Sequence, residues 1–175
     1  MNRPSWVIWN FVVFLFIFWI FAAFQSSVIH WLLGWHATPQ LTIILLTFIA
    51  LHRRSTEGYL FTFLACYSSG VMSTVLESVN VFAGTCIFLA LTAARKQVYQ
   101  GSPVHFTWSV MAAVFGYHLV MWMTNGIFDS VIPNFFVLDV VSEVLMTALL
   151  ARVFLAFFIW VDRRTKRVAV GELEL

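Results

Sequence analysis

Nearly every residue between Trp6 and Val161 belongs to an apolar stretch that only short polar breaks interrupt. Charged residues make up 10% of the 175 residues and hydrophobic ones 61%, whereas soluble domains average about 25% charged residues. So few charges cannot cover the surface of a water-soluble protein of this length. The composition therefore excludes a soluble enzyme and a disordered scaffold, and it indicates an integral membrane protein.

The polar breaks divide the chain into six segments, each of which predicts a membrane-spanning helix. A spanning helix needs about 20 residues, so six of them leave no room for a separate soluble domain. The first segment is longer than the apolar core of a signal peptide, so we expect it to be retained as a helix. We expect an all-α membrane protein with one compact six-helix domain at 1–167 and a short cytoplasmic tail at 168–175, with helices over residues 6–24, 39–51, 59–76, 81–94, 104–124 and 137–161.

Residues that start or stop helices set these predicted bounds. Pro39 is expected in the first turn of the second helix, where the backbone amide has no partner within the helix. We expect Gln25 to end the first helix, Glu77 to close the third, and Asn125-Gly126 to break the fifth. The uncharged segment Val28 to Ala37 has two interpretations, a loop outside the membrane or a re-entrant hairpin.

The basic residues predict how the bundle is oriented. With a cytoplasmic N-terminus, all Lys and Arg residues except Arg152 fall in cytoplasmic segments, and the outer loops carry none. Basic loops remain on the cytoplasmic side, so both termini are predicted to be cytoplasmic. Basic residues next to a membrane also attract anionic headgroups, which makes six of them candidate anchors to lipid: Arg53, Arg54, Arg95, Lys96, Arg163 and Arg164.

Arg152 lies inside the last predicted helix, ten residues before Asp162 and therefore about 15 Å from that end. An arginine at such depth costs about 2.5–3.5 kcal/mol on insertion scales and normally faces a partner or a cavity. One interpretation is that it snorkels toward headgroups or binds carbonyls of a neighbouring helix. The other is that it faces a groove where another membrane protein docks. Glu143 is too far along the same helix to pair with it, and Glu77 reaches it only from a more deeply inserted third helix.

The remaining polar residues do not indicate a catalytic or metal site. His118 is the histidine expected within a span, and we predict that it makes a structural hydrogen bond across the bundle rather than relaying protons. Asp139 and Glu143 share one face at the start of the last helix, where the helix dipole favours acidic side chains; a catalytic pair is the less favoured interpretation. The chain lacks phosphate-binding, zinc-protease and serine-hydrolase motifs. We expect no convergent set of polar side chains and no cofactor.

The order of features after residue 39 resembles the MreD family, the small membrane component of the bacterial rod-shape system. The similarity covers about Pro39 to Arg167 and begins with the proline that opens a short apolar helix. Two positions depart from the family pattern, because Thr74 stands where an acidic residue is common and Arg152 where a proline is expected. The similar segments are Pro39-Gln40-Leu41-Thr42-Ile43-Ile44-Leu45-Leu46, Gly70-Val71-Met72-Ser73-Thr74-Val75-Leu76-Glu77, Val81-Phe82-Ala83-Gly84 and Glu143-Val144-Leu145-Met146-Thr147-Ala148-Leu149-Leu150-Ala151.

The resemblance implies a non-enzymatic scaffold in the bacterial inner membrane that helps to organise peptidoglycan synthesis during cell elongation. It implies MreC as a partner and, through the elongation machinery, the RodA glycosyltransferase and a penicillin-binding transpeptidase. It implies no nucleic-acid partner, and a bundle similar in shape to the substrate-binding subunits of energy-coupling vitamin transporters.

The alternative function is that of such a small-molecule-binding subunit, which needs a ligand cavity on its outer side with several polar groups in its wall. An intramembrane enzyme is a third and less favoured interpretation, because the sequence presents no catalytic constellation. The polar residues expected near the outer side are His30, His36, Asp129 and Asp139.

Overall fold

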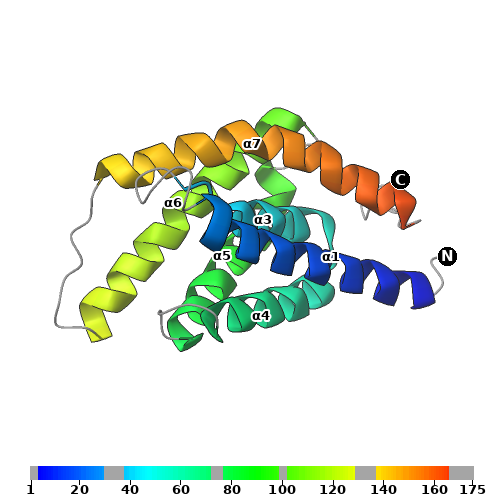
Figure 1. The fold of residues 1–175 in the computed structure, drawn as a ribbon, viewed down its shortest axis with the longest axis horizontal. Coiled ribbons are helices and arrows are strands. Elements are labelled where there is room, and N and C mark those ends of the chain that lie inside the picture. The colour runs from blue at the N-terminus through cyan, green and yellow to red at the C-terminus, as the bar shows by residue number, and fades with distance from the viewer. Residues whose placement is uncertain (1–3, 30–37, 72–76, 99–101, 129–136, 166–175) are drawn as a thin grey trace.

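The structure is a computed structural model of an all-α chain, and it describes residues 4–29, 38–71, 77–98, 102–128 and 137–165 (Figure 1). A π-helical segment, η1, directly extends the first helix. The start of α1 and the end of α7 lie at the same end of the molecule. The elements are α1 (Pro4–Phe24), η1 (Gln25–Ile29), α3 (Leu41–His52), α4 (Ser55–Val71), α5 (Glu77–Val98), α6 (Pro103–Phe128) and α7 (Val137–Arg164).

Four of the described helices contain a stretch that is long and apolar enough to cross a membrane. Two others are shorter, because α3 has 12 residues and α4 has 17. By the length and composition of its helices the chain is therefore an all-α, multi-pass membrane protein, as predicted, although four rather than six helices have the length and apolarity of a candidate span. The four candidate spans are Val7–Ser27, Ser78–Arg95, Pro103–Thr124 and Val137–Arg164.

The short helix α3 is the centre of the bundle. Leu41 and every residue from Ile43 to Leu51 are buried, and α3 contacts α1, α4, α5, α6 and α7. A helix that is apolar on all sides is typical of an element surrounded by others. Because neighbouring helices rather than lipid cover α3, it does not need the length of an isolated membrane span.

Aromatic side chains pack α3 against the first and last helices. The Phe48 ring lies 5.7 Å from the Phe14 ring of α1 and 5.0 Å from the Phe158 ring of α7, measured between centroids. All three side chains are fully buried.

The helices α4 and α5 approach closely at Gly84, where a Cβ would overlap Sγ of Cys66. Small residues allow such close approach of membrane helices.

Two predicted helix ends near the first loop are wrong. α3 begins at Leu41 instead of Pro39, since Gln40 has a non-helical backbone (φ −84°, ψ 74°) and donates its backbone N–H to Thr147 Oγ1 of α7 at 2.9 Å. Gln25 does not end the first helix, since the backbone continues as η1 to Ile29.

Later helix ends also differ from the prediction. α6 runs through Asn125-Gly126 to Phe128, because the two residues fit a helix and nothing packs within 4 Å of a Cβ at Gly126. Glu77 begins α5 instead of closing the helix before it, and α4 ends at Val71. Residues 30–37 of the possible re-entrant hairpin and the tail at 168–175 lie outside the described residues.

Polar contacts close the end of the bundle where α1 begins and α7 ends, which we call the basic end. Asp162 of α7 accepts hydrogen bonds from the Arg53 guanidinium, with which it forms an ion pair, and from Asn10 Nδ2 of α1 at 3.0 Å. Arg95 of α5 donates to the backbone oxygen of Arg53 at 2.8 Å. These contacts join the start of α1 to the ends of α3, α5 and α7.

The predicted lipid anchors have different environments. The prediction is wrong for Arg53, whose side chain is 4% exposed and lies over the Phe14 ring at 4.8 Å. Burial is possible because Asp162 compensates its charge. Arg54, Arg163 and Arg164 are exposed, and Arg95 is half-buried. The side chain of Lys96 lies outside the described residues.

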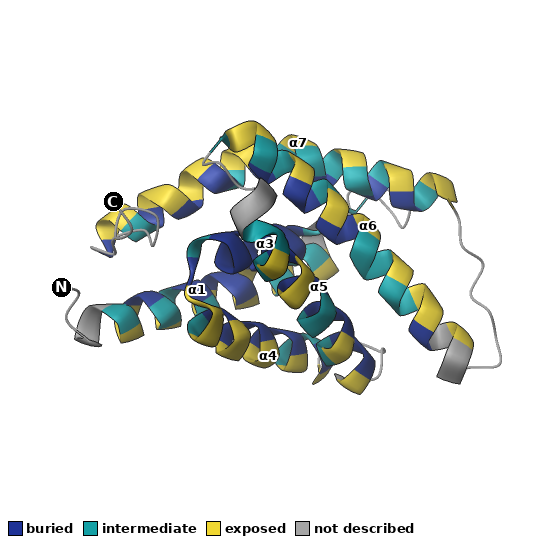
Figure 2. Cartoon of the chain, turned by 180° about the vertical axis from the view of Figure 1, so that it is seen from behind, coloured by how far each residue is buried: buried dark blue, intermediate teal, exposed yellow. Residues whose placement is uncertain are grey.

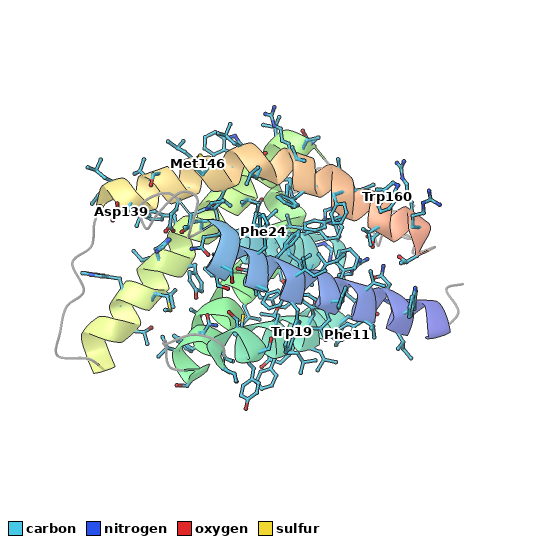
Figure 3. The ribbon with its side chains drawn as sticks, viewed as in Figure 1. Phe11, Trp19, Phe24, Asp139, Met146 and Trp160 are labelled. Atoms are coloured by element: carbon cyan, nitrogen blue, oxygen red, sulfur yellow. The ribbon has the colours of Figure 1, made fainter. Side chains whose placement is uncertain are left out.

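The outward faces of the helices are apolar, as a lipid-facing surface requires. Exposed residues follow the outer sides of α4, α6 and α7 (Figure 2), and they include many large hydrophobic side chains. Trp160 near the end of α7 is exposed and lies far from Asp139 at the other end of the helix (Figure 3). Trp9 and Trp108, close to the starts of α1 and α6, are also exposed. Tryptophan near helix ends is typical of the membrane–water interface.

We predict that Asp162→Ala destabilises the bundle by about 3 kcal/mol or more, because it removes one partner of a buried ion pair and leaves Arg53 buried without this carboxylate. The double substitution Arg53→Met with Asp162→Ala should cost less than Asp162→Ala alone, since no buried charge remains. Unfolding in detergent micelles measures both. Arg54→Ala, at an exposed neighbouring position, is the control and should change stability by no more than about 0.5 kcal/mol. Equal losses for Asp162→Ala and Arg54→Ala would contradict the prediction.

Candidate functional site

Glu143 is the centre of a polar cluster at the end of the bundle opposite the basic end, which we call the cavity end. Its side chain on α7 is 12% exposed. Glu143 Oε2 lies 2.7 Å from His118 Nε2 of α6 and accepts from Gln40 Nε2 at 3.3 Å, and Thr38 Oγ1 donates to Glu143 Oε1 at 3.4 Å. Residues from α6, α7 and the chain before α3 thus meet at one carboxylate.

The cluster extends from Gln40 to the end of the first helix. Gln40 Oε1 accepts a hydrogen bond of 2.8 Å from Gln25 Nε2 in η1. Thr147 of α7 accepts the backbone N–H of Gln40 and donates to the backbone oxygen of Glu143 at 2.6 Å. We call these six residues the Glu143 network: Gln25, Thr38, Gln40, His118, Glu143 and Thr147.

A second polar chain, the Asn80 link, connects α4, α5 and α6 at the same end. Tyr117 of α6 donates its hydroxyl proton to Asn80 Oδ1 of α5 at 2.6 Å. Asn80 Nδ2 in turn donates to the backbone oxygen of Cys66 in α4 at 3.0 Å. Asn80 is buried, so the link satisfies polar groups that the interior would otherwise leave without partners.

A cavity of about 440 Å³ lies between the Glu143 network and the Asn80 link. Sites for small molecules in proteins usually have volumes of about 300–1,000 Å³ and mostly apolar walls with a few polar groups. Here the apolar wall includes Phe18, Ile43, Leu46, Ile87 and Met121. Its polar groups belong to Gln25, Ser26, Thr38, Gln40, Thr42, Ser69, Asn80, Tyr117 and His118.

The structure confirms one prediction about polar residues and contradicts another. His118 makes a hydrogen bond across the bundle, as predicted, and its partner is Glu143. The expectation that no polar side chains converge at one depth is wrong. Burial of Glu143 gathers amides and hydroxyls around it, because an unpaired carboxylate is very costly in an apolar interior. Asp139 shares the first turns of α7 with Glu143, as expected, and is only half-buried.

Arg152 takes no part in the cluster. It lies on the exposed face of α7, and none of the hydrogen bonds or ion pairs among the described residues involves its side chain. Its neighbours along that face, Leu149 and Val153, are 72% and 65% exposed. Glu77, the other acidic candidate, has a side chain outside the described residues, as do His30, His36 and Asp129.

The cavity residues that sequence reasoning missed carry amides or hydroxyls. The sequence predicts Gln25 as the end of the first helix and Gln40 as part of the short helix that Pro39 opens. A signal was present, because Gln25 and Gln40 flank the same uncharged segment and therefore return to the same end of the bundle. That signal does not show which side chain each amide contacts.

No protein-family model, no curated protein and no solved structure matches this chain. Within the described ranges, no group of three or more His, Cys, Asp or Glu side chains is placed to hold a metal ion. The candidate site is therefore defined by its geometry alone: a cavity with a buried carboxylate behind its wall and amide and hydroxyl groups in it.

We predict a coupling energy of about 0.6–2 kcal/mol between His118 and Glu143, the range of interhelical hydrogen bonds in membrane proteins. A double-mutant cycle with His118→Ala and Glu143→Ala, measured by reversible unfolding in micelles, gives this value directly. The control cycle pairs Glu143→Ala with His105→Ala. His105 is near the start of α6, about 20 Å along the helix from His118, so these two effects should add. Additive effects in the His118 cycle would contradict the contact.

Proposed function

We propose that this chain is a non-enzymatic scaffold of the bacterial cell-elongation machinery in the inner membrane. The order of residues from Pro39 to Arg167 supports it, because this part of the sequence resembles the MreD family. In this proposal all six helices cross the membrane, with the short α3 and α4 covered by their neighbours. MreC is the direct partner, and RodA and a penicillin-binding transpeptidase join through the wider machinery.

The distribution of charge supports a cytoplasmic location for the basic end. Arg53, Arg95 and Asp162 contact one another there, and Arg54 and Arg163 are near. The cavity end, in contrast, has no Lys or Arg among its described residues. Basic residues are retained on the cytoplasmic side of membranes, so the N-in and C-in orientation agrees with the positions of these side chains.

The observation that carries the scaffold function is the position of Arg152. The helix α7 places it about 15 Å from Asp162 along the axis, on a face that is otherwise apolar. A cation at this depth normally has a partner, and the described part of the chain supplies none. A helix of another membrane protein that carries a carboxylate or free carbonyl groups at the same depth would supply it.

Snorkelling toward the headgroups is the other account of Arg152. Long basic side chains can place their stems along apolar surface and their charge in the interface. The two accounts differ in what they require of a partner, since snorkelling involves lipid alone. A substitution that leaves folding intact but weakens binding of a partner separates them.

The scaffold function is tested by partner capture and by cell shape. MreC should co-purify with the full-length chain from membranes solubilised in mild detergent, and depletion of the chain should turn rod-shaped cells round. The comparison is capture by an unrelated bundle of similar size and tag. Failure of both experiments would exclude the function proposed here.

Arg152→Ala should reduce MreC capture at least tenfold while leaving the amount of folded protein unchanged. The expected factor corresponds to about 1.4 kcal/mol, a modest value for a desolvated charge contact. Arg163→Ala, at an exposed position near the end of α7, removes the same charge and is the matched control. If Arg152→Ala instead lowers the yield of folded protein and leaves capture per molecule unchanged, the residue is structural.

The cavity favours a second candidate function, a small-molecule-binding subunit of an energy-coupling transporter. Such a subunit requires a polar-lined cavity away from the cytoplasmic side, and the cavity end has one. A thermal-shift screen with vitamins separates the two functions. Strong stabilisation by a single vitamin, together with no capture of MreC, would replace the scaffold function by this one.

A further inference from the structure

We propose that the cavity between the Glu143 network and the Asn80 link binds a small uncharged or cationic molecule that carries N–H or O–H donors on an apolar body. The volume of about 440 Å³ and the largely apolar wall fit such a molecule. This site goes beyond the scaffold function and does not depend on it, since partner capture and ligand binding are separate measurements. The remaining question is which hydrogen-bonding groups the wall presents.

The carboxylate of Glu143 fixes the direction of one polar chain. It only accepts, so Gln40 must direct its NH₂ group toward it and its carbonyl oxygen toward Gln25. Gln25 must then direct its own NH₂ group toward Gln40. The group that remains is the Gln25 carbonyl oxygen, which is buried and has no hydrogen-bond partner among the described residues. This row of hydrogen bonds therefore ends in an unused acceptor on Gln25, a residue that lines the cavity.

The backbone oxygen of Cys66 fixes the directions of the hydrogen bonds in the Asn80 link in the same way. The Cys66 oxygen accepts from the Asn80 NH₂ group, so Asn80 offers its own oxygen to Tyr117. The Tyr117 hydroxyl uses its proton in that bond and retains lone pairs on its oxygen. Ser26 likewise donates its proton to the backbone oxygen of Ala23. Gln25, Tyr117 and Ser26 thus each contribute an oxygen that can accept a hydrogen bond. The donor groups of these three residues are already used in hydrogen bonds within the protein.

The charges around the cavity limit the ligand further. None of the described residues in its wall is Lys, Arg, Asp or Glu. Glu143 lies behind Gln40 and His118. An anionic ligand would therefore meet acceptor oxygens in a wall whose described residues include no Lys or Arg. A buried acceptor without a partner costs free energy that a donor on the ligand recovers.

Three indoles of similar size test the proposal on the unaltered chain. Tryptamine is cationic and has N–H donors, indole-3-carboxamide is neutral with N–H donors, and indole-3-acetate is an anion. The full-length protein is placed in phosphatidylcholine nanodiscs, because choline headgroups have no N–H donors. Isothermal titration should show saturable one-to-one binding of the first two, at least tenfold tighter than that of indole-3-acetate. Equal binding of all three, or no saturable binding of either donor molecule, would overturn the proposal.

Two pairs of variants locate the binding. Ala22→Phe fills the cavity and should abolish tryptamine binding, whereas Ala112→Phe, the same change on an exposed face of α6, should preserve it. Gln25→Met removes the acceptor and should weaken binding at least tenfold, whereas Gln25→Glu keeps an acceptor and should retain it. Size-exclusion profiles confirm that each variant is folded. Binding that survives both Ala22→Phe and Gln25→Met lies elsewhere, and the proposal then fails.

Discussion

The structure depends on the hydrogen bonds and ion pairs that two carboxylates of α7 make with other parts of the chain. A bilayer core offers no water, so a buried carboxylate in it needs partners from the chain itself. Asp162 meets this need at the basic end by binding Arg53 and Asn10. Glu143 meets it at the cavity end by binding His118 and Gln40. These two acidic residues therefore tie α7 to segments far away in the sequence.

At both ends of the bundle a carboxylate of α7 binds side chains from distant segments, but the two arrangements differ in whether an acceptor is left over. At the basic end the carboxylate and the guanidinium compensate each other, and Phe14 and Phe48 cover the pair, so the contact closes the bundle. At the cavity end the amides around Glu143 leave a carbonyl oxygen of Gln25 without a partner beside a cavity of about 440 Å³. A closed end stabilises the fold, whereas an end with unused acceptors can receive a ligand.

Much of the fold could be predicted from the sequence because it depends on local composition. The apolar segments and the polar residues between them indicated six helices, and the described residues form six α-helices. Exact helix ends differed from the prediction, because α3 begins at Leu41 after the non-helical Gln40 and Gln25 remains helical in η1. The polar convergence at Glu143 was missed because its partners come from distant parts of the chain, between residues 38 and 118.

The sequence by itself determined that this chain is an all-α membrane protein, because a chain with 10% charged residues cannot cover a water-exposed surface. It also determined that Arg152 would be exceptional, from its depth in an apolar helix. Only the tertiary structure decided that Arg53 is buried while Arg152 faces outward. The reason is physical: a charge can be buried only where a distant segment brings an opposite charge, and Asp162 reaches Arg53, whereas no described residue reaches Arg152.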